Sequence, residues 1–168
     1  MESMRELYRH LLAEVYDAER HTLMLLDEVE TRLGAPEARS QARNCRAATG
    51  RQLEMLERAM ELLGGASPQV ASAALAGVRD DHRKLVGSAA APAVLEIGGM
   101  TALARASQLT GTMYRTLAVL AASCGQSDAH RLIERAIEEE DTAASQCAGV
   151  VARLVEAATP RRGPAVVA

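Results

Sequence analysis

Two glutamates occupy positions where the surrounding pattern is aliphatic. Glu19 is four residues from both Val15 and Leu23, and Glu140 is three residues from Ile137. These spacings place each carboxyl group on the apolar face of a helix. A carboxylate on such a face is costly unless it is paired, protonated or bound to a cation. The two glutamates therefore indicate either a metal site or acid/base chemistry in the core.

The histidines do not complete the usual metal site of a helical bundle, in which two helices each add a Glu-x-x-His pair. Three residues before the histidines at 10, 21, 82 and 130 stand Leu7, Ala18, Arg79 and Ser127. His10 and His21 lie off the Glu19 stripe, so we expect them to be solvated, with Asp17 and His21 forming an i,i+4 surface pair. In a competing interpretation, Glu19 and Glu140 lie at the boundary of their faces and reach water.

The elements that must position these residues are predicted to be helices. Apolar periodicity and stop signals place them at about 2–33, 36–63, 67–86, 92–125 and 127–159. Ser67 with Pro68, Pro92, and either Ser127 or Asp128 are the predicted helix starts. We predict an all-α, ferritin-like four-helix bundle over residues 1–159, with an additional shorter helix between its two helical hairpins and a flexible C-terminal tail over 160–168. The long helices would each measure about 40 Å.

Composition fits one globular domain with an aliphatic core. The 168 residues are 48% hydrophobic and 24% charged, and they include three Tyr but no Trp or Phe. A net charge of −3 gives no reason to expect a basic face that binds nucleic acid. No segment has the roughly 18 uninterrupted apolar residues of a membrane span. We expect neither a nucleic-acid nor a membrane partner.

Cysteine usage favours a reducing compartment. Cys45, Cys124 and Cys147 are an odd number without C-x-x-C spacing, which argues against a disulfide framework and a zinc ribbon. Cys45 and Cys147 are interpreted as small hydrophobic residues. The N-terminus lacks a basic region followed by an apolar stretch. A cytoplasmic, unprocessed protein is expected.

Four segments, in order, resemble those of the YciF-like family of ferritin-like bacterial stress proteins. They are HLL at 10–12 with YDAER at 16–20, TGRQLE at 49–54, the run from Tyr114 through Leu117 to Leu120, and the run from Leu132 to the acidic residues at 138–140. The similarity spans about 6–154. It implies a ferritin-like four-helix bundle, commonly dimeric, whose inward carboxylates resemble a di-iron or di-manganese site.

The same resemblance implies that several metal ligands have been replaced. Glu19 and Glu140 match expected ligands, and Gln52 matches a polar position beside the site. At further acidic positions of the family this chain has Ala48, Ser107, Thr110 and Ala144. Two carboxylates leave the charge of two divalent metals uncompensated. What remains could bind a single iron or manganese ion weakly, or the two acids could share a proton.

Three functions remain open at this point. The first is a non-catalytic or stress-associated homodimer with a degenerate dinuclear site. The second is an enzyme in which Glu19 and Glu140 act as acid and base, with Tyr114 orienting a small apolar substrate in a core pocket opened by Ala48, Ser107 and Thr110. The third is retained metal oxidase or peroxide-detoxifying chemistry with ligands in another register. A homodimer is expected because an Ala-rich core gains from further apolar burial.

Overall fold

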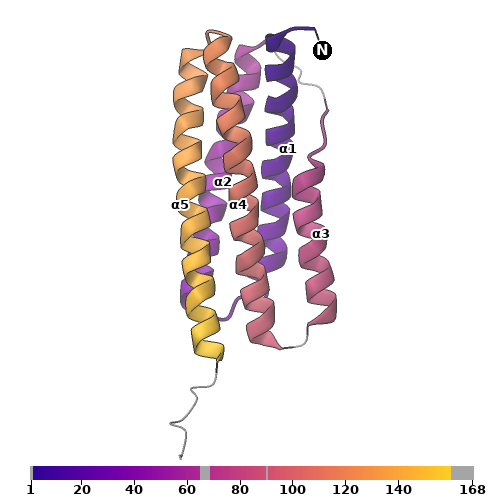
Figure 1. Cartoon of the computed structure of the whole chain (residues 1–168), viewed down its shortest axis with the longest axis vertical. Coiled ribbons are helices and arrows are strands. Elements are labelled where there is room, and N and C mark those ends of the chain that lie inside the picture. Colours follow the sequence, from indigo (N-terminus) through magenta and orange to yellow (C-terminus); the bar gives the residue numbers. More distant parts are fainter. Residues whose placement is uncertain (1, 65–68, 90, 160–168) are drawn as a thin grey trace, which may run out of the picture.

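Five helices build the part of the chain that the computed structural model describes, which is residues 2–64, 69–89 and 91–159, and no strand occurs there. In chain order they are α1 (Met4–Glu30), α2 (Pro36–Leu62), α3 (Ala73–Ser88), α4 (Pro92–Ser123) and α5 (Ser127–Ala158). The four long helices run side by side, and the shorter α3 packs outside them against α1 and α4 (Figure 1). The predicted all-α bundle with one extra helix between its hairpins is confirmed.

The core consists of two aliphatic clusters arranged along the bundle. One contains Val15 of α1 together with Tyr114 of α4, and the other contains Leu25 of α1 together with Leu103 of α4. Glu19 lies between Val15 and Leu25 on α1, so the carboxyl group sits where the two clusters meet. Within the described residues, no helix is both long enough and apolar enough to cross a membrane.

Two glycines of α4 allow close helix approach. A Cβ added at Gly99 would lie 2.9 Å from Cγ1 of Val29, and a Cβ added at Gly111 would lie 3.3 Å from Cβ of Glu140. Helix α4 is continuous through both positions, although glycine lowers intrinsic helix stability. The small residues therefore let α4 approach α1 and α5, and they bring Glu140 into the core.

The start of the short helix differs from the prediction. Ser67 and Pro68 lie outside the described residues, but residues 69–72 are not helical and α3 begins at Ala73. The physical reason is a contact that spacing does not reveal: the backbone N–H of Ser72 donates to Oδ2 of Asp17 at 2.8 Å. This bond holds Ser72 extended, so the helix starts after it.

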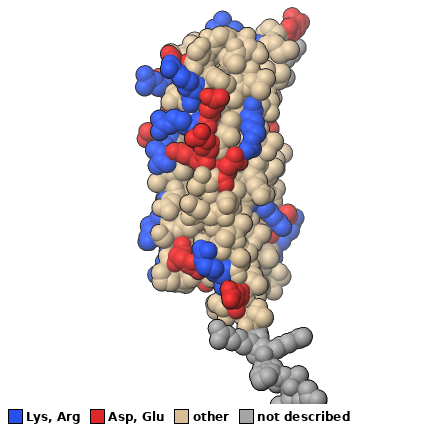
Figure 2. Space-filling view, turned by 60° about the vertical axis from the view of Figure 1, so that its left-hand side comes forward, with Lys and Arg blue, Asp and Glu red and all other residues tan. Residues whose placement is uncertain are grey.

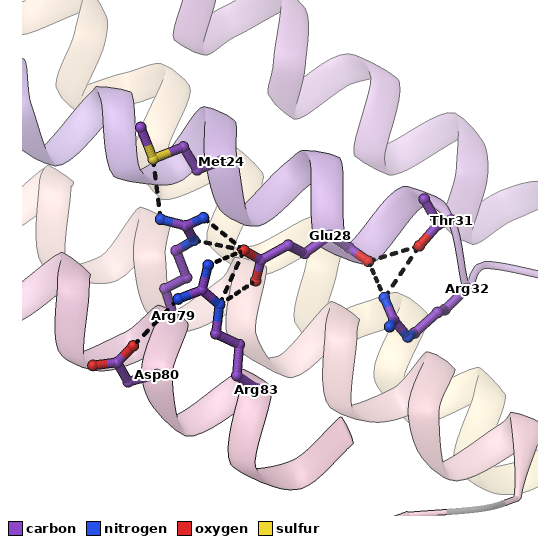
Figure 3. A network of polar contacts seen from close by, with 7 residues as sticks. All are labelled: Met24, Glu28, Thr31, Arg32, Arg79, Asp80 and Arg83. Atoms are coloured by element: carbon purple, nitrogen blue, oxygen red, sulfur yellow. Dashed lines mark hydrogen bonds and ion pairs between the residues drawn. The ribbon is translucent and has the colours of Figure 1, made fainter. Parts of the chain in front are cut away.

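Helix α3 is fixed to α1 by ion pairs with Glu28. Arg79 and Arg83 both reach Oε1 of Glu28, at 2.7 and 2.8 Å (Figure 3). Arg79 also contacts the sulfur of Met24. Partial burial raises the pKa of Glu28, but hydrogen bonds from Arg83 and Arg79 outweigh it and the net pKa is lowered. As expected for an outer helix, α3 buries few residues.

The start of α5 also differs from its predicted cap. Neither Ser127 nor Asp128 is the cap, because both lie within the first turn and Gln126 is the N-cap residue, without a side-chain cap hydrogen bond. The preceding turn is instead closed by the backbone N–H of Gln126 donating to the carbonyl of Ala121 at 2.9 Å. The predicted tail, 160–168, lies outside the described residues.

Candidate functional site

Glu19 is enclosed in the centre of the bundle. Its side chain is 0% exposed, and Oε1 accepts a 2.9 Å hydrogen bond from the Tyr114 hydroxyl of α4. Oε2 is buried without a well-formed hydrogen bond, and Thr49 of α2 is a further polar neighbour of the carboxyl group. Burial raises the pKa of Glu19 well above its usual value, and the charge of Glu140 raises it further.

Glu140 of α5 is nearly as buried, at 4% exposure, and it has more hydrogen-bond partners. The Thr110 hydroxyl donates to its Oε2 at 3.0 Å, and Ser107 and Gln52 also stabilise its charged form. Burial raises the pKa of Glu140, while these partners offset part of the effect. The interpretation in which Glu19 and Glu140 reach water is therefore wrong.

Tyr114 is the polar link between α4 and α1. The side chain is completely buried, and burial, followed by the charge of Glu19, raises its pKa well above the usual value. The phenol therefore stays neutral and acts as a hydrogen-bond donor to Glu19. A neutral donor satisfies a carboxyl oxygen without balancing its charge, so Glu19 keeps a strong tendency to hold its proton.

Gln52 is buried beside the site, at 2% exposure, and its amide group contacts both Glu140 and Glu139. Its Nε2 donates to Oε2 of Glu139 at 3.4 Å, whereas its Oε1 is buried without a hydrogen bond. Glu139 itself pairs with Arg51 at 3.1 Å on the surface. Figure 2 shows acidic and basic side chains gathered together on this side of the bundle. The acidic residues before Glu140 are thus mainly on a solvated face.

The donor set does not fit a dinuclear metal centre. In the described ranges, no group of three or more His, Cys, Asp or Glu side chains could hold a metal ion. Around Glu19 and Glu140, the positions where the family resemblance implies acids carry the neutral groups of Ser107 and Thr110 or the methyl group of Ala48. Divalent iron or manganese needs anionic ligands to offset its charge. The residues present supply two carboxyl groups, both biased by burial toward the neutral form.

The interior space beside Glu140 is very small. A cavity of about 10 Å³ is lined by Thr22, Cys45, Ala48, Thr49, Leu103, Ser107, Glu140 and Ala143. This volume is close to that of one water molecule. Two of the predicted pocket residues, Ala48 and Ser107, line it, whereas Thr110 is engaged with Glu140. The cavity leaves no room for the apolar substrate of the enzyme hypothesis.

Sequence reasoning did not single out three residues of this site. Thr22, Thr49 and Cys45 line the cavity together with the predicted residues. Thr22 stands three residues after Glu19, and this spacing places both on one helix face, so Thr22 could have been predicted at the site. The contribution of α2 depends on how the helices pack. The predicted i,i+4 pair of Asp17 and His21 forms, with 3.5 Å between Oδ2 and Nε2, but both side chains are half-buried rather than solvated.

Four long helices, a fifth helix outside them and two buried carboxyl groups in the core define a four-helix bundle with an additional outer helix. Solved structures of other proteins share this fold at low sequence identity. The E. coli stress protein YciF superimposes with a TM-score of 0.85 and 19% identity, covering 93% of this chain and 99% of that one. YcfI from Rhodopseudomonas palustris gives 0.82 and 21%, covering 88% and 94%. A protein from Xanthomonas campestris pv. campestris gives 0.75 and 22%, covering 92% and 95%.

The model of one protein family, described as "Domain of unknown function (DUF892)", matches residues 3–159. The chain therefore belongs to the DUF892 family, and with these structural neighbours it is YciF-like, as the segment order predicted. No curated protein sequence matches it significantly.

Proposed function

We propose that this chain is a ferritin-like protein that has lost its dinuclear metal centre and acts as a non-catalytic, stress-associated homodimer. The observation that carries the proposal is the hydrogen bonding of the two buried acids. The Tyr114 hydroxyl donates to Glu19, and the Thr110 hydroxyl donates to Glu140. These hydroxyl groups satisfy carboxyl oxygens that would otherwise face a metal. The site holds protons in place of cations.

Charge explains why this arrangement opposes metal binding. Each carboxyl group would have to lose its proton before binding a cation, and burial raises the pKa of both Glu19 and Glu140. A pair of divalent ions would then retain most of its charge inside an aliphatic core. A single iron or manganese ion at Glu19, Glu140 and Gln52 would be held weakly for the same reason.

The wider role rests on the fold and the surface. The E. coli protein of the same fold is a stress protein, which supports a stress-associated role for this chain. Large apolar side chains remain exposed on several helices, including Val119 at 65%, Val94 and Val155. Covering them in a homodimer would remove apolar area from water. A cytoplasmic location agrees with the cysteine usage of the sequence.

Metal analysis of protein purified without chelator tests the loss of the site. We expect substoichiometric iron and manganese in the wild type. The matched variant carries Ala48→Glu, Ser107→Glu and Thr110→Glu, which restore acids at the replaced positions, and we expect it to retain more metal if it folds. Two tightly bound ions per wild-type chain would refute the proposal.

The remaining parts of the proposal need separate measurements. Light scattering after size-exclusion chromatography reports whether the chain is a dimer, and Val119→Lys tests one of its exposed apolar positions. In the source organism, we expect protein abundance to rise under stress. A deletion phenotype should be complemented equally by the wild type and by a Glu19→Gln, Glu140→Gln variant. Failure of that variant alone would show that the acids act chemically.

A further inference from the structure

Two cysteines remote in sequence meet in the core beside the carboxyl site. Cys45 lies on α2 and Cys147 on α5, and their sulfur atoms are 3.8 Å apart. Both side chains are buried as free thiols. The amide of Gln41, one turn before Cys45, donates toward both sulfurs, at 3.5 and 3.7 Å. Two thiols and one amide therefore form a compact polar cluster between two helices.

The cluster lies beneath an open groove between α2 and α5. The groove has a volume of about 420 Å³, and its lining includes Gln41, Cys45, Ala48 and Ala143. Cys45 also lines the small cavity beside Glu140. Cys45 thus borders both the groove and the cavity, whereas Cys147 is not among the residues that line them. A small solute in the groove reaches Cys45 first.

The two thiols differ in acidity. The contact with Cys45 lowers the pKa of Cys147, and Gln41 adds to this effect. The same contact, together with burial, raises the pKa of Cys45. Cys147 is therefore the more acidic of the two thiols. Its sulfur, 3.8 Å away, can take the proton of the Cys45 thiol when Cys45 reacts.

We propose that Cys45 and Cys147 form a dithiol that a small hydroperoxide oxidises stoichiometrically to an intramolecular disulfide between α2 and α5. The Cys45 sulfur attacks one oxygen of the hydroperoxide while its thiol proton passes to the Cys147 sulfur. The O–O bond breaks, and the second oxygen leaves as an alcohol or water after taking a proton from solvent. Cys45 becomes a sulfenic acid, oxidised by two electrons. The sulfur of Cys147 then attacks the sulfur of Cys45. The S–S bond forms, the S–OH bond breaks, and the hydroxide leaves as water with the Cys147 proton.

The surroundings accommodate the closure. A disulfide has sulfurs about 2.05 Å apart, so the two atoms must approach by roughly 1.8 Å. Ala48 and Ala143 line the groove and the cavity together with Cys45 and present only methyl groups there, so no large side chain blocks rotation of Cys45. The third cysteine, Cys124, ends α4 and packs against the other core cluster. It is not required for the reaction.

The test uses the full-length, fully reduced protein and hydrogen peroxide. We expect the intact mass to fall by two hydrogen atoms, and alkylation after unfolding to find one free thiol where the reduced protein has three. Peptide mapping should join Cys45 to Cys147, and a dithiol reductant should reverse the change. These measurements on the wild type need no variant to fold.

Matched variants assign the roles. Cys124→Ser should form the same disulfide at the same rate. Cys147→Ser should stop at a sulfenic acid on Cys45, detected by a dimedone adduct. Cys45→Ser should give no adduct on Cys147 while the variant stays folded. The proposal is overturned if wild-type protein keeps three thiols after treatment, if the bond involves Cys124 or joins two chains, or if overoxidation occurs without a disulfide.

Discussion

Replacing Glu19 with glutamine should change how the stability of the bundle depends on pH. Glu19 is fully buried, and burial raises its pKa well above its usual value of 4.5. Glutamine has nearly the same shape and can still accept the hydrogen bond from Tyr114. Glutamine cannot ionise, so the variant has no titrating carboxyl group at this buried position.

The sign follows from proton linkage. Between the unfolded and the folded pKa of Glu19, the unfolded chain has already released the proton that the folded protein still holds. Raising the pH therefore favours unfolding, by about 1.4 kcal/mol per pH unit for one group. Below pH 4.5 the effect vanishes, and above the folded pKa it reaches a plateau. The Gln variant lacks this slope, so its stability relative to the wild type should rise by about 2 kcal/mol between pH 5 and 6.5.

Urea unfolding followed by circular dichroism measures the difference at each pH. In a thermal melt, the expected change in unfolding free energy corresponds to a shift of about 4–8 °C in the midpoint temperature for a chain of this size. Exposed Glu61 of α2 offers a matched control, since Glu61→Gln makes the same substitution on the surface. That variant reports the effect of the same chemical change at an exposed position. All other titrating groups are common to the compared proteins and cancel.

The free energies of unfolding of Glu19→Gln and the wild type can differ by a constant amount, because the new amide group places N–H donors where Oε2 has no well-formed hydrogen bond. Such a constant difference does not affect the test. The decisive quantity is the slope. If the difference between the two proteins does not change between pH 5 and 6.5, Glu19 does not hold its proton in the folded state. The proton-holding site proposed above would then be refuted.

Three further changes test other contacts. Tyr114→Phe removes the donor to Glu19 and should lower the free energy of unfolding by about 1–3 kcal/mol in urea titrations, because a buried acceptor loses its partner. Gly99→Ala should lower the free energy of unfolding by about 1–3 kcal/mol, because the new Cβ would lie 2.9 Å from the buried, branched side chain of Val29. This overpacking outweighs the better helix propensity of Ala. A stabilised variant would contradict this geometry. His82 is buried with both ring nitrogens unpartnered, and burial lowers its pKa, so the unfolded chain takes up a proton first as the pH falls. The stability of the wild type should therefore drop below pH 6.5 relative to that of His82→Gln. Parallel pH profiles of the two proteins would rule this out.

Local patterns were sufficient to predict the helices and the inward faces. Periodicity of three and four residues placed Glu19 and Glu140 on apolar stripes, and the structure buries both. Proline at 92 correctly marked the start of α4. These features depend on neighbours within one or two turns of the same helix, which a sequence displays directly.

Contacts between elements were not readable in this way. Asp17 of α1 determines where α3 begins by binding the backbone of Ser72, so the start predicted from Ser67 and Pro68 was wrong. Tyr114 was expected at the site as a residue that orients a substrate, but its hydrogen bond to Glu19, 95 residues away, was not predicted. Neither distance along the chain nor residue type specifies such pairs, because they depend on the rotation and offset of packed helices.

The cysteines show the same division. Their odd number and spacing led to the interpretation of Cys45 and Cys147 as small hydrophobic residues, and both are indeed buried. Their meeting at 3.8 Å, across 102 residues, was decided by the packing of α2 against α5. By itself the sequence determined which faces turn inward. Tertiary structure decided which side chains meet there, because the relative position of two helices is set by all their contacts together.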